Sequence, residues 1–145
     1  MPNQDPSFHI DSIDFDPEGL ELITALHHRY SVRCHQVFMG RNRNVFDMGR
    51  YVVKVPKNLD GFADNDWEGS VSNANEDPDE IRYARTRMAY FADIPVVFME
   101  YAEHADTQDM VSRLGQEPAW VGCVDCGQVG FTRDGRLVAY DYGVR

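Results

Sequence analysis

Three short apolar runs follow one another between His35 and Pro56, and a turn separates each run from the next. The run HQVFM leads into the polar turn GRNRN, the run VFDM leads into the tight turn Gly49-Arg50, and the third run is YVVKVP. Runs of this length, punctuated by Gly and Asn, predict three short β-strands, and Pro56 is expected to end the third. The centre of the chain is therefore expected to form an antiparallel sheet.

A helix is predicted on the N-terminal side of these strands. Asp16 is a typical N-cap, Pro17 suits the first helical position, and apolar residues then recur at helical spacing over residues 17–30. Residues 1–15 show no such spacing, so we expect them to form an irregular N-terminal arm.

The segments after Pro56 complete an α+β pattern. The same signals predict a short helix within the polar segment 57–80 and a buried strand in IPVVFMEYA. They also predict a strand in IRYARTRMAYF, although Arg and Met also suit a helix there. A short helix capped by Asp106 or Thr107 and a C-terminal β-hairpin that turns at Arg133-Asp134-Gly135 follow these strands. We expect residues 1–145 to form a single α+β domain, with an antiparallel sheet of about five strands, a few helices and the hairpin.

Length and composition agree with a globular domain. The chain has 145 residues, of which 43% are hydrophobic and 12% aromatic, and this suffices for an ordinary core. No apolar run approaches the ~20 residues that span a bilayer. The N-terminal stretch has neither the basic region nor the apolar region of a signal peptide. We therefore expect a soluble cytoplasmic protein without membrane association.

Acidic residues are concentrated in two blocks. The net charge is −10, and neither residues 1–28 nor residues 60–80 contain a Lys or Arg. Nucleic-acid binding requires a positive surface that displaces counterions from phosphates, so we expect no direct binding to DNA or RNA. The blocks are either a solvated surface that keeps the protein soluble, or a face that docks a protein partner with a basic surface.

The cysteines do not form a disulfide or zinc pattern. There are three, Cys34, Cys123 and Cys126, and the pair CVDC lacks the second pair or the spaced His residues that would complete four zinc ligands. We therefore do not expect zinc, although His35 beside Cys34 leaves a partial ligand set open.

Lys54 is the residue whose position most needs explaining. It is one of two lysines and stands between valines in YVVKVP, where a buried cation is costly unless it is paired or bound to an anion. Glu68 is the best-placed downstream acid for such a pair. The alternative is a lysine on an edge strand whose ammonium extends to solvent.

Taken in order, these parts resemble the nucleotide-binding half of the protein-kinase-like fold, over about residues 35–143. In that family a loop between the first two strands covers the ATP phosphates and a lysine on the third strand holds them. A helix glutamate orients the lysine, and the Asp of an Asp-Phe-Gly turn holds magnesium. The resemblance implies ATP and Mg²⁺ as ligands. It assigns the phosphate loop to Gly40–Asn44, with Gly40, Arg41 and Asn42 as contacts. The strand lysine would be Lys54 and the helix glutamate Glu68. The hinge that contacts adenine would be Met99–Ala102, with Glu100 and Ala102 as contacts, and the metal ligands would be Gln128 and Asp141.

One detail of spacing supports the resemblance, and several details depart from it. Gln128 precedes Asp141 by 13 positions, the separation at which the family places its magnesium-binding Asn. However, Gln replaces that Asn, the loop has one glycine where the family has three, and no His-Arg-Asp triplet occurs. Asp125 is the candidate catalytic base, although the family's base lies further from the metal ligand. Two residues follow the turn Asp141-Tyr142-Gly143, so we expect most of the family's second lobe to have no counterpart.

Two functional hypotheses follow. The first is a minimal kinase-like protein that binds ATP and Mg²⁺ and is weak or inactive as a phosphotransferase, because little chain remains to position an acceptor. The second is a non-enzymatic acidic protein, similar in general character to small phage or mobile-element proteins, that inhibits a host protein by occupying a basic or nucleic-acid-binding surface. The sequence does not indicate an oligomeric state.

Overall fold

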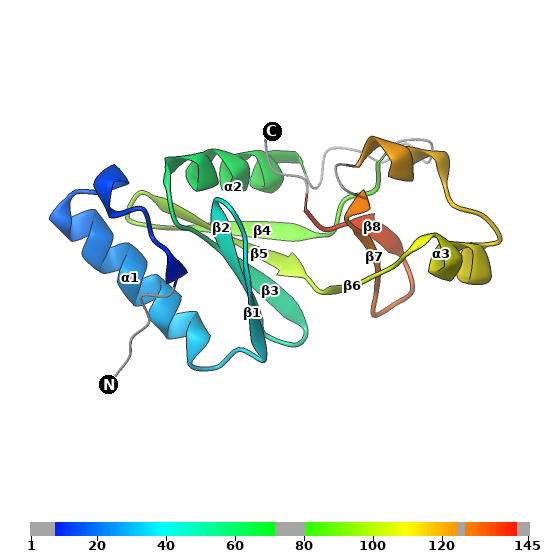
Figure 1. Ribbon diagram of the computed structural model, residues 1–145, viewed down its shortest axis with the longest axis horizontal. Coiled ribbons are helices and arrows are strands. Elements are labelled where there is room, and N and C mark those ends of the chain that lie inside the picture. Colours follow the sequence, from blue (N-terminus) through cyan, green and yellow to red (C-terminus); the bar gives the residue numbers. More distant parts are fainter. Residues whose placement is uncertain (1–7, 72–80, 125–126, 142–145) are drawn as a thin grey trace.

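The computed structural model describes residues 8–71, 81–124 and 127–141. In chain order its elements are η2 (Ser12–Asp14), α1 (Pro17–Ser31), β1 (Gln36–Met39), β2 (Arg43–Asp47), β3 (Tyr51–Pro56), α2 (Leu59–Val71), β4 (Thr86–Phe91), β5 (Ile94–Glu100), β6 (Ala102–His104), α3 (Thr107–Leu114), η3 (Ala119–Cys123), β7 (Val129–Thr132) and β8 (Leu137–Ala139). Figure 1 shows them as a larger sheet with two long helices, followed by a smaller sheet with α3 beside it. The α+β prediction is confirmed.

The larger sheet has five antiparallel strands in the order β1-β2-β3-β5-β4. The three strands predicted from the central runs are confirmed, and Pro56 is the last residue of β3. The segment that also suited a helix forms β4, an edge strand that pairs with β5 along its whole length. As a result β3, which carries Lys54, lies in the middle of the sheet.

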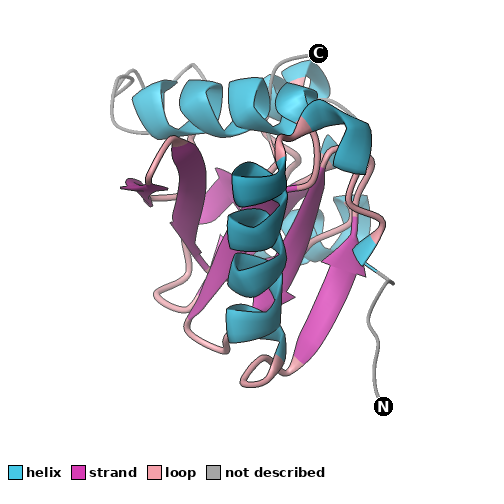
Figure 2. Cartoon of the chain, turned by 90° about the vertical axis from the view of Figure 1, so that its left-hand side faces the viewer, coloured by secondary structure: helices cyan, strands magenta, loops and turns pink. Residues whose placement is uncertain are grey.

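The two long helices pack on opposite faces of this sheet because successive strand residues point to opposite sides. Val53 and Val55 of β3 belong to the core cluster that contains Ile23 and Leu26 of α1. Lys54 points to the other face, where α2 lies. Figure 2 shows α1 along the strands and α2 above them. The helix α1 begins as predicted, with Asp16 as its N-cap and the Asp16 side chain accepting from the Gly19 N–H.

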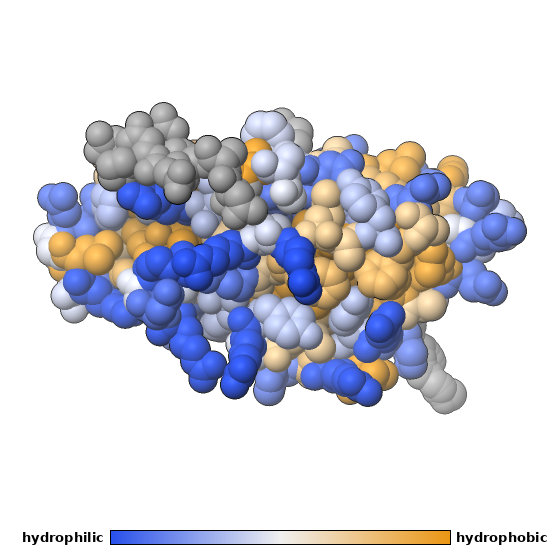
Figure 3. Space-filling view, turned by 180° about the vertical axis from the view of Figure 1, so that it is seen from behind, coloured by the Kyte–Doolittle hydropathy of each residue, from blue (hydrophilic) through white to orange (hydrophobic). Residues whose placement is uncertain are grey.

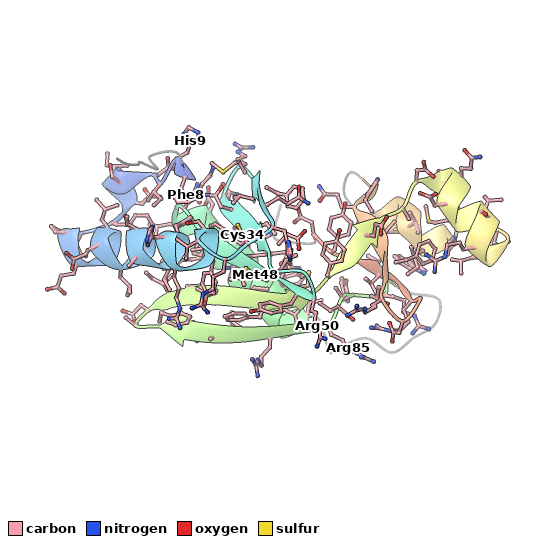
Figure 4. All side chains as sticks on the ribbon, turned by 90° about the horizontal axis from the view of Figure 1, so that it is seen from below. Phe8, His9, Cys34, Met48, Arg50 and Arg85 are labelled. Atoms are coloured by element: carbon pink, nitrogen blue, oxygen red, sulfur yellow. The ribbon has the colours of Figure 1, made fainter. Side chains whose placement is uncertain are left out.

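The expected N-terminal arm is anchored to the core at Phe8. Phe8, labelled in Figure 4, is buried against the rings of His27 and Phe46. Its backbone oxygen accepts a hydrogen bond from the Asn44 side chain at 2.8 Å. An apolar ring and a backbone acceptor therefore tie residue 8 to the core, which helical periodicity could not reveal. Residues 1–7 of the arm lie outside the described part of the chain.

The smaller sheet has the order β6-β7-β8, and β7 and β8 form the predicted hairpin. Its turn contains Gly135, whose φ of +87° is the left-handed conformation that glycine adopts without strain. The helix α3 begins at the predicted cap Asp106, which forms a capping box with Asp109. A shared apolar cluster of Ala84, Val97, Met99 and Val138 joins the two sheets. Within the described residues, none of the helices combines the length and the apolar run that crossing a membrane requires.

Candidate functional site

Lys54 and Glu68 form a buried ion pair between β3 and α2. Lys54 is 2% exposed and Glu68 is 0% exposed, and the lysine Nζ lies 2.9 Å from Glu68 Oε1. The strand alternation turns Lys54 toward α2, while residues 61, 64, 65 and 68 recur on the buried face of that helix. The predicted pairing is confirmed. The alternative of an edge-strand lysine that extends to solvent is wrong, because β3 is central.

Two further charged residues complete a network that we call the buried charge network: Arg43, Lys54, Glu68 and Asp141, of which the first three are buried and Asp141 is partly exposed. Arg43, on β2, places Nη1 2.7 Å from Glu68 Oε1 and Nη2 2.8 Å from Asp141 Oδ1. Asp141 follows β8, so the hairpin brings the end of the described chain to the same point as the Lys54–Glu68 pair. Two cations and two carboxylates balance each other, which lets the group remain buried.

Neutral polar groups hold the network in place. Arg43 Nη1 also donates to Asn65 Oδ1 at 3.0 Å, and Asn65 donates to the backbone oxygens of Lys54 and Pro95. Lys54 donates to the backbone oxygen of Tyr140 at 2.6 Å. Buried polar groups with this many partners define a single arrangement of α2, β3 and the end of β8.

The pKa values reflect both burial and pairing. Burial raises the pKa of the Glu68 carboxyl, but the adjacent Lys54 and Arg43 cations outweigh it and lower the pKa to about 2. Burial lowers the pKa of the Lys54 ammonium, although Glu68 and Asp141 oppose that change. For Arg43, burial disfavours the charged form, but Glu68 overcomes it and raises the pKa. Glu68 is thus a carboxylate at every pH at which the protein would work.

A cavity of about 720 Å³ lies beside the network, and we call it the β1–β2 cavity. It is lined by Gly40, Arg41, Asn42, Arg43, Val45, Asp60, Ala63, Asp64, Gln128 and Asp141. The structure therefore brings together five of the predicted site residues: Gly40, Arg41, Asn42, Gln128 and Asp141. Lys54 and Glu68 do not line the cavity, but they belong to the same charge network as Arg43 and Asp141, which do line it.

The turn between β1 and β2 is shorter than the predicted phosphate loop and is held against α2. Arg43 and Asn44 belong to strand β2, so the turn consists of residues 40–42. The Asn42 backbone oxygen accepts from the Lys57 N–H at 2.9 Å, and its side chain donates to Asp64. A Cβ on Gly61 would lie 2.3 Å from the Asn42 oxygen, so only glycine permits this approach of helix and turn.

The predicted hinge residues lie elsewhere. Glu100 forms an ion pair with Arg136 and accepts from the Arg85 N–H. Ala102 begins β6 and pairs with Thr132 of β7, and neither Glu100 nor Ala102 lines the β1–β2 cavity. The candidate base Asp125, together with Tyr142 and Gly143 of the predicted metal-binding turn, lies outside the described residues.

The oxygen ligands of the cavity suit Mg²⁺ only when a phosphate contributes. Asp64, Asp141 and Gln128 offer side-chain oxygens, which are the donors that Mg²⁺ prefers. Even so, in the described ranges no three His, Cys, Asp or Glu side chains are grouped closely enough to hold a metal ion by themselves. Mg²⁺ usually binds proteins through one or two carboxylates together with substrate phosphates, and this donor set fits that mode.

Arg43 and Asp64 are functional candidates whose contacts sequence reasoning did not assign. Arg43 falls within the expected phosphate loop, but in the structure it is the central cation of the network. The signal was the alternation of β2: Val45 stands opposite Lys54 in the sheet, so Arg43, two positions away, faces the same side. Asp64 lies one helical turn before Glu68 on α2, on the same buried face.

No model of a known protein family matches this chain, and no curated protein matches its sequence.

Proposed function

We propose that this chain is a kinase-like protein that binds a nucleoside triphosphate with Mg²⁺ in the β1–β2 cavity and is weak or inactive as a phosphotransferase. One observation carries the proposal. A buried lysine–glutamate pair between a central strand and a helix lies next to an aspartate that follows a C-terminal hairpin. A turn between two strands covers the cavity at that point. The resemblance to kinases implies this arrangement of the pair, the turn and the aspartate, although Lys54 itself does not line the cavity.

The cavity offers separate groups for phosphate and for metal. Arg41, which is exposed at the tip of the turn, and the backbone N–H groups of residues 41 and 42 would contact the phosphates, since the Gly40 N–H already donates to the Arg43 oxygen. Asp141 and Gln128 would supply oxygen ligands to Mg²⁺, with the phosphate oxygens completing its shell. Bound there, Mg²⁺ would neutralise phosphate charge.

The same contacts account for weak catalysis. Asp141 is already paired with Arg43 at 2.8 Å, and Lys54 donates to the Tyr140 oxygen at 2.6 Å. A nucleotide must displace or rearrange these contacts before either side chain can act on phosphate or metal, which lowers its affinity. Efficient transfer also requires an aligned acceptor.

We expect ATP with Mg²⁺ to raise the melting temperature. A ligand at ten times its Kd adds about 1.4 kcal/mol, which corresponds to roughly 5 °C for a domain of this size. Arg41→Ala and Gln128→Ala should reduce the shift, because both side chains line the cavity without belonging to the buried charge network. Differential scanning fluorimetry on the full chain is the measurement.

The matched control is Arg87→Ala, which removes an exposed arginine from β4 that does not line the cavity. It should keep the full shift, and Mg²⁺ alone should give none. A shift that persists unchanged in both cavity variants, or no shift at millimolar ATP with Mg²⁺, would contradict the proposal.

A second candidate function rests on a different surface. At the junction of η2 and α2, Ile13 is 93% exposed and Leu59 is 54% exposed. The Asp14 side chain accepts from the Leu59 N–H at 3.0 Å, so the two elements meet there. Exposed apolar side chains among carboxylates suit a protein partner with a basic surface, because the apolar groups supply contact area and the acids steer association. We propose this patch, Ile13 and Leu59, as the partner site of the non-enzymatic alternative.

If that alternative holds, Ile13→Ser and Glu21→Lys, the latter in the acidic block of residues 1–28, should each weaken the capture of a basic partner from a lysate. Moderate salt should release the captured partner. Both side chains are exposed, so neither change should affect folding. Val32→Ser is the matched control, since Val32 is an exposed apolar residue at the other end of α1. Quantitative pull-down is the measurement. If the amount of captured partner is unchanged by Ile13→Ser, by Glu21→Lys and by salt, this alternative is refuted.

A further inference from the structure

A second cavity, of about 650 Å³, lies where the chain passes from the larger sheet to the smaller one. Three arginines line it, Arg50, Arg113 and Arg133, together with Tyr101, His104 and Phe131. We call it the arginine cavity. Figure 4 labels Arg50 at the end of the larger sheet that faces the smaller one. The Arg50 backbone oxygen accepts a hydrogen bond from the Tyr101 N–H. It shares no lining residue with the β1–β2 cavity.

The arginines come from three separate elements. Arg50 belongs to the turn between β2 and β3, Arg113 to the last turn of α3, and Arg133 to the turn between β7 and β8. In the part of the chain that the structure describes, none of the three guanidinium groups has an ion pair or a hydrogen bond. This contrasts with Arg43 and Arg136, which are both paired with carboxylates.

Arg113 is positioned by an aromatic ring. Its guanidinium carbon lies 4.0 Å from the centroid of Phe131, which is 6% exposed. Stacking on a buried ring restrains the guanidinium plane while its N–H groups remain able to donate. A restrained arginine loses less conformational entropy when it binds a ligand than a mobile one.

Carboxylates offset only part of this charge. Glu103 and Asp109 also line the cavity, and Asp109 already accepts the Asp106 N–H in the capping box of α3. The lining thus carries three formal positive charges against two negative ones, in a protein whose net charge is −10. On the face shown in Figure 3, hydrophilic side chains gather over the half that contains α3 and the smaller sheet.

We propose that the arginine cavity binds a small phosphate monoester of about mononucleotide size. Guanidinium groups match the oxygens of phosphate in pairs, and three of them approaching from different elements suit a tetrahedral dianion better than a planar carboxylate. The volume exceeds what a phosphate ion alone needs and falls within the range of small-molecule sites, about 300–1,000 Å³. Tyr101 offers an aromatic surface for the remainder of the ligand.

The test is a titration of the full chain in EDTA with AMP, ribose 5-phosphate, inorganic phosphate and adenosine, read by isothermal calorimetry. AMP and ribose 5-phosphate should bind, inorganic phosphate should bind more weakly, and adenosine should not bind. Arg133→Ala, at an exposed turn where folding does not depend on the side chain, should weaken the affinity for AMP at least tenfold. A loss of that size corresponds to one charge-assisted contact. Arg113→Ala should do the same, and its melting curve would show any loss of packing on Phe131.

Arg87→Ala is the control for general charge, and Arg41→Ala separates this cavity from the β1–β2 cavity. Both should bind AMP as the parent does. The proposal is overturned if adenosine binds as tightly as AMP, if Arg133→Ala leaves AMP affinity unchanged, or if Arg87→Ala reduces it equally. Inorganic phosphate binding as tightly as AMP would overturn the monoester assignment. Loss of AMP binding in Arg41→Ala would place the ligand in the other cavity and overturn the proposal as well.

Discussion

Replacing Glu68 by Gln should lower the free energy of unfolding by about 3–5 kcal/mol, the usual cost of breaking a buried ion pair from one side. Glu68 is fully buried and accepts from both Lys54 and Arg43. The substitution keeps the shape but removes the charge, so Lys54 is left in the interior with reduced compensation. Urea denaturation at pH 7, with unchanged m-value, is the measurement.

Asp66→Asn is the matched control, two positions away on the same helix. Asp66 is exposed and bonds the Tyr90 hydroxyl, so its substitution should change stability by less than about 0.5 kcal/mol. The double variant Glu68→Gln with Lys54→Met should lose less free energy of unfolding than the sum of the losses in the two single variants, because the second change removes the uncompensated cation. Additive losses, or a Glu68→Gln protein as stable as the parent, would show that the pair contributes little.

Acidification from pH 6.5 to pH 4 should lower stability by about 3 kcal/mol through His27 alone, at 1.36 kcal/mol per unit of pKa difference. Burial is the main cause that lowers the His27 pKa from 6.5 to about 4. The folded pKa is depressed, so between these values the unfolded chain binds more protons, and stability falls as pH falls. His27 donates from Nδ1 to the Ile23 oxygen, and a proton on Nε2 would find no partner among the described residues.

His27→Phe should abolish this part of the pH dependence, because Phe is apolar and the site is lined by Phe8 and Phe46. His28→Gln, at the exposed neighbouring position, should retain it. The measurement is the unfolding free energy at pH 7, 6, 5 and 4 for the three proteins. An identical slope in His27→Phe and the parent over that range would rule out the assignment. The Glu68 contribution falls in a different window, since its pKa is lowered from 4.5 to about 2 and its stabilisation is lost as pH falls through those values.

Local sequence signals predicted most of the elements because those elements depend on local chemistry. Asp16 and Pro17 begin α1, Asp106 begins α3, and Gly135 turns the hairpin, each through contacts within a few residues. The helix α2 was harder to predict because Gly61 and Gly69 lower its intrinsic propensity. In the structure these glycines let the helix approach Asn42 and Met88 closely, so tertiary packing stabilises a helix that propensity disfavours.

The charged pair of the site could be predicted, but the surroundings of the pair could not. A lysine between valines requires an anion, and Glu68 was the best-placed acid in the segment that follows. That Asp141 meets the pair through Arg43 depends on how the hairpin packs on the larger sheet, over 98 positions of sequence. Glu100 and Ala102 of the expected hinge do not line the β1–β2 cavity. Ala102 belongs to β6, which pairs with β7, and the local sequence of such a short strand does not indicate which strand it will pair with.

The sequence by itself determined the α+β class, the three α-helices and most of the strands, and the need for a partner to the one lysine that stands among valines. These depend on periodicity, turn residues and the cost of burying a charge, which act over short distances along the chain. Only the tertiary structure decided that Arg43 and Asp141 join that pair, and that three arginines without an ion pair among the described residues line a cavity at the junction of the two sheets. Contacts of that kind depend on how separate elements pack, because residues far apart in the chain become neighbours only when the sheets and helices assemble.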